Sequence, residues 1–267
     1  MTAKKKKKQK VIVVMPAYNA AKTVAQTYHD IPKGVVDEVS KDDTIEVARQ
    51  LSIRVVVHRE NKGYGGNQKT CYTEALLAGA DVVVMLHPDY QYDSRVIPTM
   101  IQPILDGQAD FVMGSRIIGE GALKGGMPWW KFFFNRVLTT IENIILNRKF
   151  SDLHTGFRAY SRRLLCDVPY VLNSDNFVFD SQMIAQTNYR GYVCTEVPIP
   201  TRYFKEASSV SFKTSTIYGF ATLYVMGQLA LQKMGIQRFA WLEKRLEDVI
   251  SRPYAEKIFS KARHVQK

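Results

Sequence analysis

The chain has few cysteines, and no two of them are close in sequence. Its 267 residues include three cysteines, none in a CxxC pair. This scarcity excludes a disulfide framework and a structural zinc site, since both need paired or clustered thiols. We therefore expect Cys71, Cys166 and Cys194 to be reduced thiols in a protein of the cytosol.

Long apolar runs are also scarce. The run at 11–15 stops at Pro16, so we do not expect it to be a signal peptide. The most apolar helical stretch, 217–234, is interrupted by Gln228 and Gln232 and is near the lower length limit for a membrane span. We expect it to be buried or to lie in a membrane interface rather than to cross one.

Positive charge exceeds negative charge, with a formal net charge of +12. Five of the positive charges are the consecutive lysines 4–8, which favour a solvated, disordered tail. Each lysine near an anionic leaflet contributes roughly 1 kcal/mol, so the tail would help to tether the chain to a membrane but would not anchor it alone. No nucleic-acid-binding motif is evident, so nucleic acid is not expected as a partner.

The segment 82–93, VVVMLHPDYQYD, is the most informative in the chain. Its first five residues are apolar, which is typical of a central strand covered on both faces. Polar residues follow at once, and ligands gather beyond the carboxyl ends of strands in such sheets. Asp89 and Gln91 could offer oxygen ligands to a hard divalent cation. The alternative is an ordinary turn with Asp93 or Ser94 as a helix N-cap.

Apolar runs alternate with helical patterns along the rest of the chain. This alternation predicts an α/β domain with a mostly parallel sheet flanked by helices, followed by amphipathic C-terminal helices. The other expected strands are 11–15, 53–58, 109–113 and 192–197. The expected helices are 20–29, 44–51, 68–78, 94–106, 129–146, 161–166, 181–189, 217–234 and 238–263.

Two loops could meet a nucleotide. The first follows the strand at 11–15 and can present backbone N–H groups, the Tyr18 ring and a helix N-terminus. The second, 61–67, is rich in glycine, which lets the backbone approach a ligand closely, although a hairpin-like turn is an alternative. The candidate donor-binding residues are Pro16, Ala17, Tyr18, Asn19, Gly63, Gly66 and Asn67.

Several cations and hydroxyls follow later strands. Arg116 comes at a strand's carboxyl end and could bind phosphate through its planar fork, with a surface ion pair as the alternative. Arg158 ends a polar turn at 152–158 and is a further phosphate or acceptor candidate. The last candidates are Arg202, Ser208 and Ser209, in a segment that could equally be a plain surface loop.

Asp180 is expected at the N-terminus of the helix 181–189. A carboxylate there can be a cap, a general base or a group that orients an acceptor. The segment 129–146 mixes aromatic and basic residues in an amphipathic pattern, which suits the membrane interface, with packing on the core as the alternative.

The motifs, in order, resemble those of the family 2 inverting glycosyltransferases, and within that group look most like the polyprenol-phosphate (dolichol-phosphate) sugar synthases. The likeness covers about residues 11–209. The motifs are MPAYNA (15–20), SKDDT (40–44), ENKGYGGN (60–67), HPDYQYD (87–93), GSR (114–116), DLHTGFRAYSR (152–162) and FVFD (177–180).

This resemblance implies the GT-A fold, a nucleotide-diphosphate sugar donor, Mg²⁺ or Mn²⁺, and an acceptor such as polyprenyl phosphate at a membrane surface. It implies that Pro16 and Tyr18 contact the nucleoside and that Asp89 and Gln91 hold the metal. The residues implied to meet phosphates are Arg116, Arg202, Ser208 and Ser209. Asp180 would face the reaction centre and would be the candidate base if the acceptor were a hydroxyl.

The chain departs from the family pattern at three places. His87 stands where the metal motif usually begins with Asp, and Ala20 where the lipid-phosphate branch commonly has Glu. A second apolar strand ending in paired aspartates is missing before Ser40, and Asp37 or Asp42 could compensate for it. A catalytically weak or inactive relative that binds a membrane surface or a nucleotide sugar is therefore the alternative function.

These expectations divide the chain into three parts. They are a basic disordered tail at 1–10, a GT-A domain at 11–210, and a helical segment at 211–267 that can associate with a membrane. The expected location is the cytoplasm, peripheral at the cytoplasmic face of the membrane.

Overall fold

The computed structural model describes residues 9–18, 20–32, 47, 50–51, 53–118, 121–202 and 212–263. In this part of the chain the strands form one five-stranded sheet. The strands are β1 (Val11–Val14), β2 (Val82–Met85), β3 (Phe111–Ser115), β4 (Arg158–Ser161) and β5 (Cys194–Pro198). The helices are α1 (Val24–His29), α3 (Gly63–Leu77), α4 (Ile97–Leu105), α5 (Gly121–Lys124), α6 (Trp129–Leu146), α7 (Arg162–Asp167), α8 (Phe179–Tyr189), α9 (Phe212–Lys233), α10 (Ala240–Glu243), α11 (Leu246–Val249) and α12 (Arg252–Arg263), with short 3₁₀ turns η1 (Ser94–Val96) and η3 (Tyr170–Leu172).

The sheet has the order β1-β2-β4-β3-β5. β1 pairs parallel with β2, and β3 pairs parallel with β5. β4 is antiparallel to both of its neighbours, so the other four strands run in one direction. Their carboxyl ends therefore meet at one edge of the sheet, where ligands bind in folds of this class.

Alternation along β2 separates the core into two clusters, one on each face of the sheet. Val82 and Val84 belong to the cluster that includes residues of α1 and α4. Val83 and Met85 belong to the cluster that includes residues of α3, α7 and α8. Because all four side chains are fully buried, β2 is covered on both sides, as its unbroken apolar run predicts.

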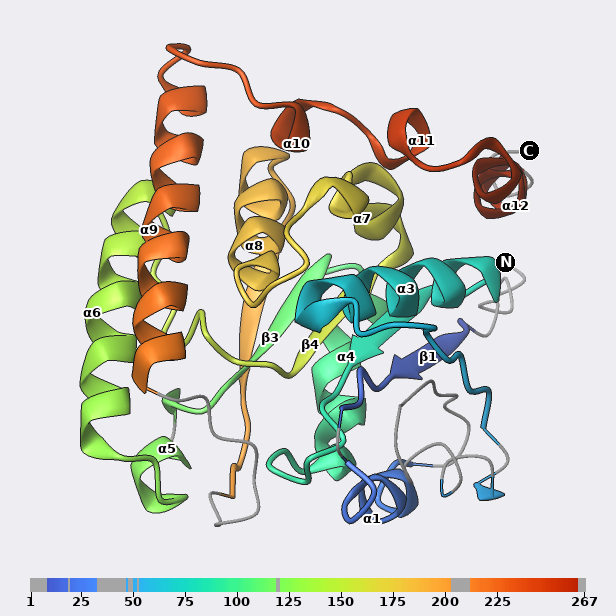
Figure 1. The fold of residues 1–267 in the computed structure, drawn as a ribbon, viewed down its shortest axis with the longest axis horizontal. Helices are drawn as coiled ribbons and strands as arrows, with labels where there is room; N and C mark the ends of the chain where they lie inside the picture. The colour runs from blue at the N-terminus through green and yellow to red at the C-terminus, as the bar shows by residue number, and fades with distance from the viewer. Residues whose placement is uncertain are drawn as a thin grey trace, which may run out of the picture.

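The helices α6 and α9 form an outer layer on one side of the molecule (Figure 1). They pack side by side, and α9 also packs on α8, which lies between α9 and the sheet (Figure 1). α6 is followed by Asn147, whose φ of +53° is the left-handed conformation common after a helix.

Most expected elements are confirmed, and α6 has the bounds that its pattern predicts. The strand expected at 53–58 is wrong, because those residues form no strand. The strand β4 lies where a polar turn and a helix start were expected, because its four residues, RAYS, lack an apolar run. The C-terminal segment forms three helices, with Pro253 in the first turn of α12, where its missing N–H is tolerated.

Residues 1–8 of the basic tail lie outside the described residues. The same holds for most of the expected helix at 44–51, and for Asp37 and Asp42. In the part of the chain that the structure describes, no helix combines the length and the apolar character needed to cross a bilayer.

Candidate active site

The turn after β2 carries the two candidate metal ligands. Asp89 and Gln91 lie at the carboxyl edge of the sheet. Asp89 Oδ1 accepts a hydrogen bond from the backbone N–H of Gln91 at 3.1 Å. Tyr90 between them has a φ of +59°, a conformation that is uncommon for a bulky residue. Its hydroxyl donates to Asp30 Oδ2 at 2.9 Å. This turn is held in a strained form, as is frequent at functional sites.

Arg202, which follows β5, lies against the same turn. Its backbone N–H donates to the Gln91 carbonyl at 2.9 Å, and its guanidinium carbon is 4.8 Å from the centre of the Tyr90 ring. Its Nη2 is 3.5 Å from Asp93 Oδ2. Arg202 Nη1 is buried and has no hydrogen-bond partner among the described residues. A buried N–H group without an acceptor costs free energy, so a ligand that brought an acceptor to it beside Asp89 and Gln91 would be favoured.

The alternative interpretation of this turn, with Asp93 as a cap, is also realised. Asp93 precedes η1 and its side chain accepts a hydrogen bond from the Arg95 amide. The capping carboxylate and the two metal candidates thus belong to one segment, and the two interpretations do not exclude each other.

His87 stands where the family's metal motif usually has Asp, but its ring contacts Tyr64. Its Nε2 is 3.2 Å from the Tyr64 hydroxyl. The single Tyr64 proton goes to Asp180 Oδ2 at 2.7 Å, so the His87 nitrogen is the donor to Tyr64. Burial lowers the pKa of His87, which keeps its ring neutral. A Cβ at Gly156 would be only 2.4 Å from His87 Cδ2, so glycine there makes room for the ring.

Asp180, at the start of α8, is the acceptor for three donors. Tyr64 donates to Oδ2, while Gln68 Nε2 is 3.0 Å and Arg158 Nη1 3.1 Å from Oδ1. Burial, followed by the charge of Asp180, raises the pKa of Tyr64 well above its usual value, so the phenol stays protonated. The Asp180 carboxylate is thus an organising anion, with both of its oxygens engaged.

Arg158 does not fit the prediction of a phosphate or acceptor ligand. It lies in β4, and its side chain is fully buried. Its guanidinium donates to the carbonyl oxygens of Leu153, Thr155 and Asp180 and pairs with the Asp180 carboxylate. These partners surround the fork, so Arg158 ties β4 to α8 instead of facing a ligand.

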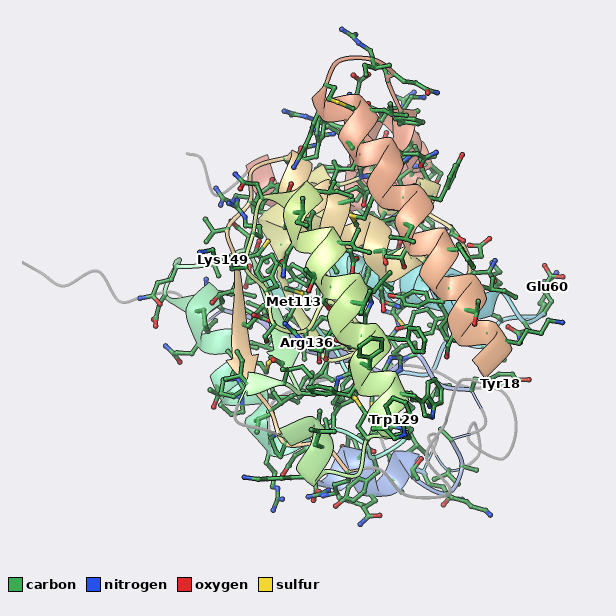
Figure 2. All side chains as sticks on the ribbon, turned by 90° about the vertical axis from the view of Figure 1, so that its left-hand side faces the viewer. Tyr18, Glu60, Met113, Trp129, Arg136 and Lys149 are labelled. Carbon is green, nitrogen blue, oxygen red and sulfur yellow. The ribbon has the colours of Figure 1, made fainter. Side chains whose placement is uncertain are left out.

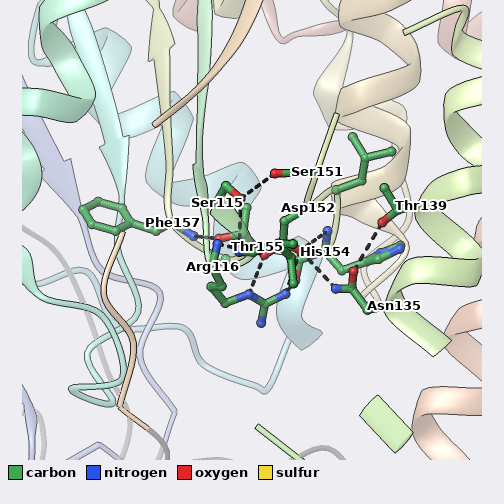
Figure 3. Close-up of polar contacts among 12 residues, drawn as sticks. Ser115, Arg116, Asn135, Thr139, Ser151, Asp152, His154, Thr155 and Phe157 are labelled. Carbon is green, nitrogen blue, oxygen red and sulfur yellow. Dashed lines mark hydrogen bonds and ion pairs between the residues drawn. The ribbon is translucent and has the colours of Figure 1, made fainter. Parts of the chain in front are cut away.

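Arg116, directly after β3, forms a buried fork-to-fork pair with Asp152 (Figure 3). Nε is 2.7 Å from Asp152 Oδ2, Nη2 is 2.9 Å from Oδ1, and Nη2 also donates to the His154 carbonyl. Burial alone would raise the pKa of Asp152, but the charge of Arg116 holds that pKa well below its usual range. The ion-pair alternative is therefore realised inside the protein.

His154 joins this segment to the outer helices. Its Nε2 is 3.0 Å from Glu142 Oε2 on α6, and its Nδ1 is 2.9 Å from the Tyr218 hydroxyl on α9. Burial would lower the pKa of His154, but Tyr218 and the Glu142 carboxylate raise it to about 10. The raised pKa favours a protonated ring between the two helices, and its contact with Glu142 is an ion pair without hydrogen-bond geometry.

The glycine-rich segment is the first turn of α3, so the expected loop is wrong. An added Cβ at Gly63 would lie 2.5 Å from the Asp175 carbonyl oxygen, and one at Gly66 would lie 2.8 Å from Lys62 Cβ and 3.3 Å from Asp175 Oδ1. The shortest such distance is at Gly65, where an added Cβ would lie 2.2 Å from the Ser174 carbonyl oxygen. These glycines admit neighbouring protein atoms, chiefly residues 174–176, rather than a ligand.

The candidate nucleoside residues lie beyond β1. Pro16 and Ala17 are buried, and Tyr18 is exposed. Asn67 Nδ2 donates to the Ala17 carbonyl at 3.5 Å, which brings α3 to this loop. The other predicted members, Asn19, Ser208 and Ser209, lie outside the described residues.

The donor set of the turn after β2 fits a hard cation that is shared with a substrate. Carboxylate and amide oxygens are ligands that Mg²⁺ and Mn²⁺ accept, and Mg²⁺ is usually held by one or two carboxylates plus substrate phosphates. The described residues include no group of three or more His, Cys, Asp or Glu side chains that could hold a metal ion. Asp89 and Gln91 are the residues that could hold one in company with a diphosphate.

Residues 12–168 match the family model described as glycosyl transferase family 2. The chain belongs to this family. An uncharacterised protein of Methanocaldococcus jannaschii is 30% identical to this glycosyltransferase over 233 residues, covering 85% of the chain and 93% of that relative. A dolichyl-phosphate hexose transferase of Haloferax volcanii is 32% identical and covers 71% and 82%. A UDP-N-acetylglucosamine–dolichyl-phosphate N-acetylglucosaminyltransferase of Methanococcus voltae is 27% identical and covers 84% and 96%.

Solved structures support the fold. Glucosyl-3-phosphoglycerate synthase from Mycobacterium tuberculosis, in complex with phosphoglyceric acid, aligns with a TM-score of 0.62 at 20% identity, covering 86% of this glycosyltransferase and 81% of that chain. A complex of the same synthase with Mn²⁺, UDP and glucosyl-3-phosphoglycerate aligns with a TM-score of 0.61 at 19% identity. The expected GT-A fold and the resemblance to polyprenol-phosphate sugar synthases are thereby confirmed.

Several residues at the centre of this glycosyltransferase carry no clear signal in the sequence. Tyr64 and Gln68 lie within α3, where nothing marks them as partners of Asp180. Asp152 and His154 belong to a polar motif, DLHTGFR, whose charged residues indicate a site without showing which of them pair. Glu142 has a clearer signal, since it is the one acidic residue in the α6 helix.

Proposed function

We propose that this glycosyltransferase moves a sugar from a nucleotide-diphosphate sugar to polyprenyl phosphate presented at a membrane surface, with inversion at the anomeric carbon. One observation carries the proposal. The Asp89–Gln91 turn offers two oxygen donors at the carboxyl edge of the sheet, and the unpartnered Nη1 of Arg202 lies beside it. Such a site suits a diphosphate, because it supplies both a cation position and a fixed positive charge.

The donor nucleoside would lie over the loop after β1. The exposed Tyr18 ring, the buried Pro16 and the contact between Ala17 and Asn67 support that position. The departing diphosphate would extend from there to Arg202. The guanidinium is held by the Tyr90 ring and Asp93, so it is oriented before the donor arrives.

A divalent cation, Mg²⁺ or Mn²⁺, held by Asp89 and Gln91 would offset the charge that develops on the leaving diphosphate. The oxygen donors of the turn support this assignment. The glucosyl-3-phosphoglycerate synthase that shares this fold has been solved with Mn²⁺ and UDP bound together, which is consistent with it.

In the transfer, an oxygen of the acceptor phosphate forms a bond to the anomeric carbon while the bond from that carbon to the donor diphosphate breaks. The electron pair of the broken bond leaves with the diphosphate, and no proton has to be removed from an ionised phosphate. The engagement of both Asp180 oxygens favours such an acceptor, since a free base is not required. Asp180 would then position Arg158 and Tyr64 rather than accept a proton.

Relatives named for dolichyl-phosphate and polyprenol acceptors support a lipid phosphate as the acceptor. The acceptor would be reached from the cytoplasmic face of the membrane, with the protein bound peripherally. The division into tail, GT-A domain and C-terminal helical segment belongs to the same proposal.

Calorimetry with a panel of nucleotide sugars tests the donor site. With Mn²⁺ present, we expect heat of binding for at least one donor, and a loss of about 2–4 kcal/mol of binding free energy in Asp89→Ala, comparable to removing one charge-assisted contact. Absence of heat with every donor would favour the alternative of a membrane-binding relative without donor affinity. Equal binding by the variant would refute the role of Asp89.

A further inference from the structure

The outer helices α6 and α9 each carry an exposed apolar side. On α6 the exposed apolar residues recur at helical spacing, and on α9 they do the same. The set, called here the α6–α9 face, is Trp129, Phe133, Phe134, Val137, Ile141 and Ile144 on α6, with Ile217, Phe220 and Tyr224 on α9. Trp129 and Ile144, at opposite ends of α6, are each 75% exposed, so the face extends along the whole helix.

Each helix buries its opposite side. On α6 the buried residues are Thr139, Glu142 and Leu146, and on α9 they include Met226 and Leu229. The exposed side chains are therefore not the rim of an internal contact. Figure 2 views the molecule from this side, with α6 and α9 in front and Trp129 near the lower end of α6. An apolar face of this extent on a monomeric protein marks an interaction surface.

The charges on the two helices have one sign. α6 contains Lys131 and Arg136, and α9 contains Lys213 and Lys233. The only acidic residue in either helix is Glu142, which is fully buried against His154. Arg136 donates to the Ser151 carbonyl and Lys233 donates to the Ile145 carbonyl and Asn188 Oδ1, so these two cations are engaged within the protein. Lys131 and Lys213 accompany the exposed apolar side chains, and no carboxylate on either helix is exposed.

This distribution selects among the possible occupants. A symmetric dimer through the α6–α9 face would bring together two patches whose exposed charges are all positive, because each copy presents the same patch. A bilayer with anionic head groups instead complements both features, since aromatic rings enter the interface and cations meet the head groups. We propose that the α6–α9 face is the docking surface for an anionic lipid bilayer. The proposal deepens the proposed function, and its relevance to the acceptor rests on that function.

Contacts through His154 connect the face to Arg116, which follows β3 at the carboxyl edge of the sheet. His154 bridges Glu142 of α6 and Tyr218 of α9, and its carbonyl accepts from Arg116. At the other end, Lys131 lies near Arg116, whose charge adds to the effect of burial in lowering the pKa of Lys131. Docking through this face would therefore hold the edge of the site at the head-group level, where a lipid phosphate is found.

Flotation with vesicles tests the inference. The vesicles are phosphatidylcholine with or without phosphatidylglycerol, and the protein is the full chain without donor. The test variant is Phe133→Glu/Phe220→Glu, which changes two exposed rings of the face. The matched control is Leu172→Glu/Tyr254→Glu, which adds the same charge at exposed apolar residues elsewhere. All three proteins keep the lysine tail, so its contribution is the same in each.

We expect the wild type and the control to partition onto vesicles with phosphatidylglycerol, and the face variant to partition roughly 10- to 100-fold more weakly. Partition that is equal in the face variant and the control would overturn the inference, as would a wild type that binds neither vesicle. Sedimentation velocity that shows a wild-type dimer dissociated by the face variant would also overturn it, in favour of a second copy of the chain.

Transfer to a detergent-dispersed lipid phosphate separates this inference from the proposed function. The face variant should retain transfer there, because its changed residues lie outside the candidate site. Vesicle binding without transfer by the wild type would refute the proposed function while leaving the docking surface intact.

Discussion

The buried pair of Arg158 and Asp180 gives the sharpest stability prediction. The Arg158 side chain is inaccessible to solvent and Asp180 is almost so. In Asp180→Ala the guanidinium keeps its three carbonyl acceptors but loses the only opposite charge in contact with it among the described residues. Removing one partner of such a pair costs about 3–5 kcal/mol of the free energy of unfolding.

Urea unfolding followed by circular dichroism measures this change. The reference is Glu256→Ala, which removes a carboxylate from an exposed pair with Arg252 and should cost under about 1 kcal/mol. The double variant Arg158→Met/Asp180→Ala should be more stable than the sum of the two single changes predicts, because no unpaired charge remains. A cost under about 1 kcal/mol for Asp180→Ala, or strict additivity, would refute the role of Asp180 as the buried counterion.

Two further predictions concern packing and pH. Gly65→Ala should lower the free energy of unfolding by about 1–3 kcal/mol, because the added Cβ would meet the Ser174 carbonyl oxygen. The control Gly227→Ala places its Cβ in open space on α9 and should not lower it. Equal stability of the two variants in urea would contradict this prediction. The pKa of His154, raised to about 10 in the folded protein from about 6.5 in the unfolded chain, means that its stabilising contribution is complete below pH 6.5 and is lost as pH rises toward 10. Urea unfolding across this range should show a shallower decline in His154→Gln, and parallel profiles would count against a buried imidazolium.

The sequence predicts the parts of the fold that depend on local pattern. The apolar run of β2 and the amphipathic period of α6 identify those elements. A strand buried on both faces has consecutive apolar residues, whereas a helix buried along one side has apolar residues three or four positions apart. β4 has no such signal, since its residues owe their burial to long-range partners such as Met85 and Met113. The local sequence pattern does not show which distant strands will pair.

The same division holds for the site. The turn at Asp89 and Gln91, and the position of Arg202, follow from residues placed after strands. Arg158 could not be assigned in this way, because only the folded chain shows that its fork is filled by carbonyl groups and by Asp180. The glycines at the start of α3 mislead for a similar reason. A glycine that admits a ligand and one that admits another backbone segment look alike in sequence.

The central claim is that the Asp89–Gln91 turn serves sugar transfer to a lipid phosphate. The direct measurement is donor-dependent transfer of a labelled sugar to polyprenyl phosphate in the presence of Mn²⁺, with wild type and Asp89→Ala compared. We predict transfer by the wild type and a loss of at least about 100-fold in the variant. Equal transfer by both proteins would contradict the role of the turn, and no transfer by the wild type with any donor that it binds would contradict the proposed reaction.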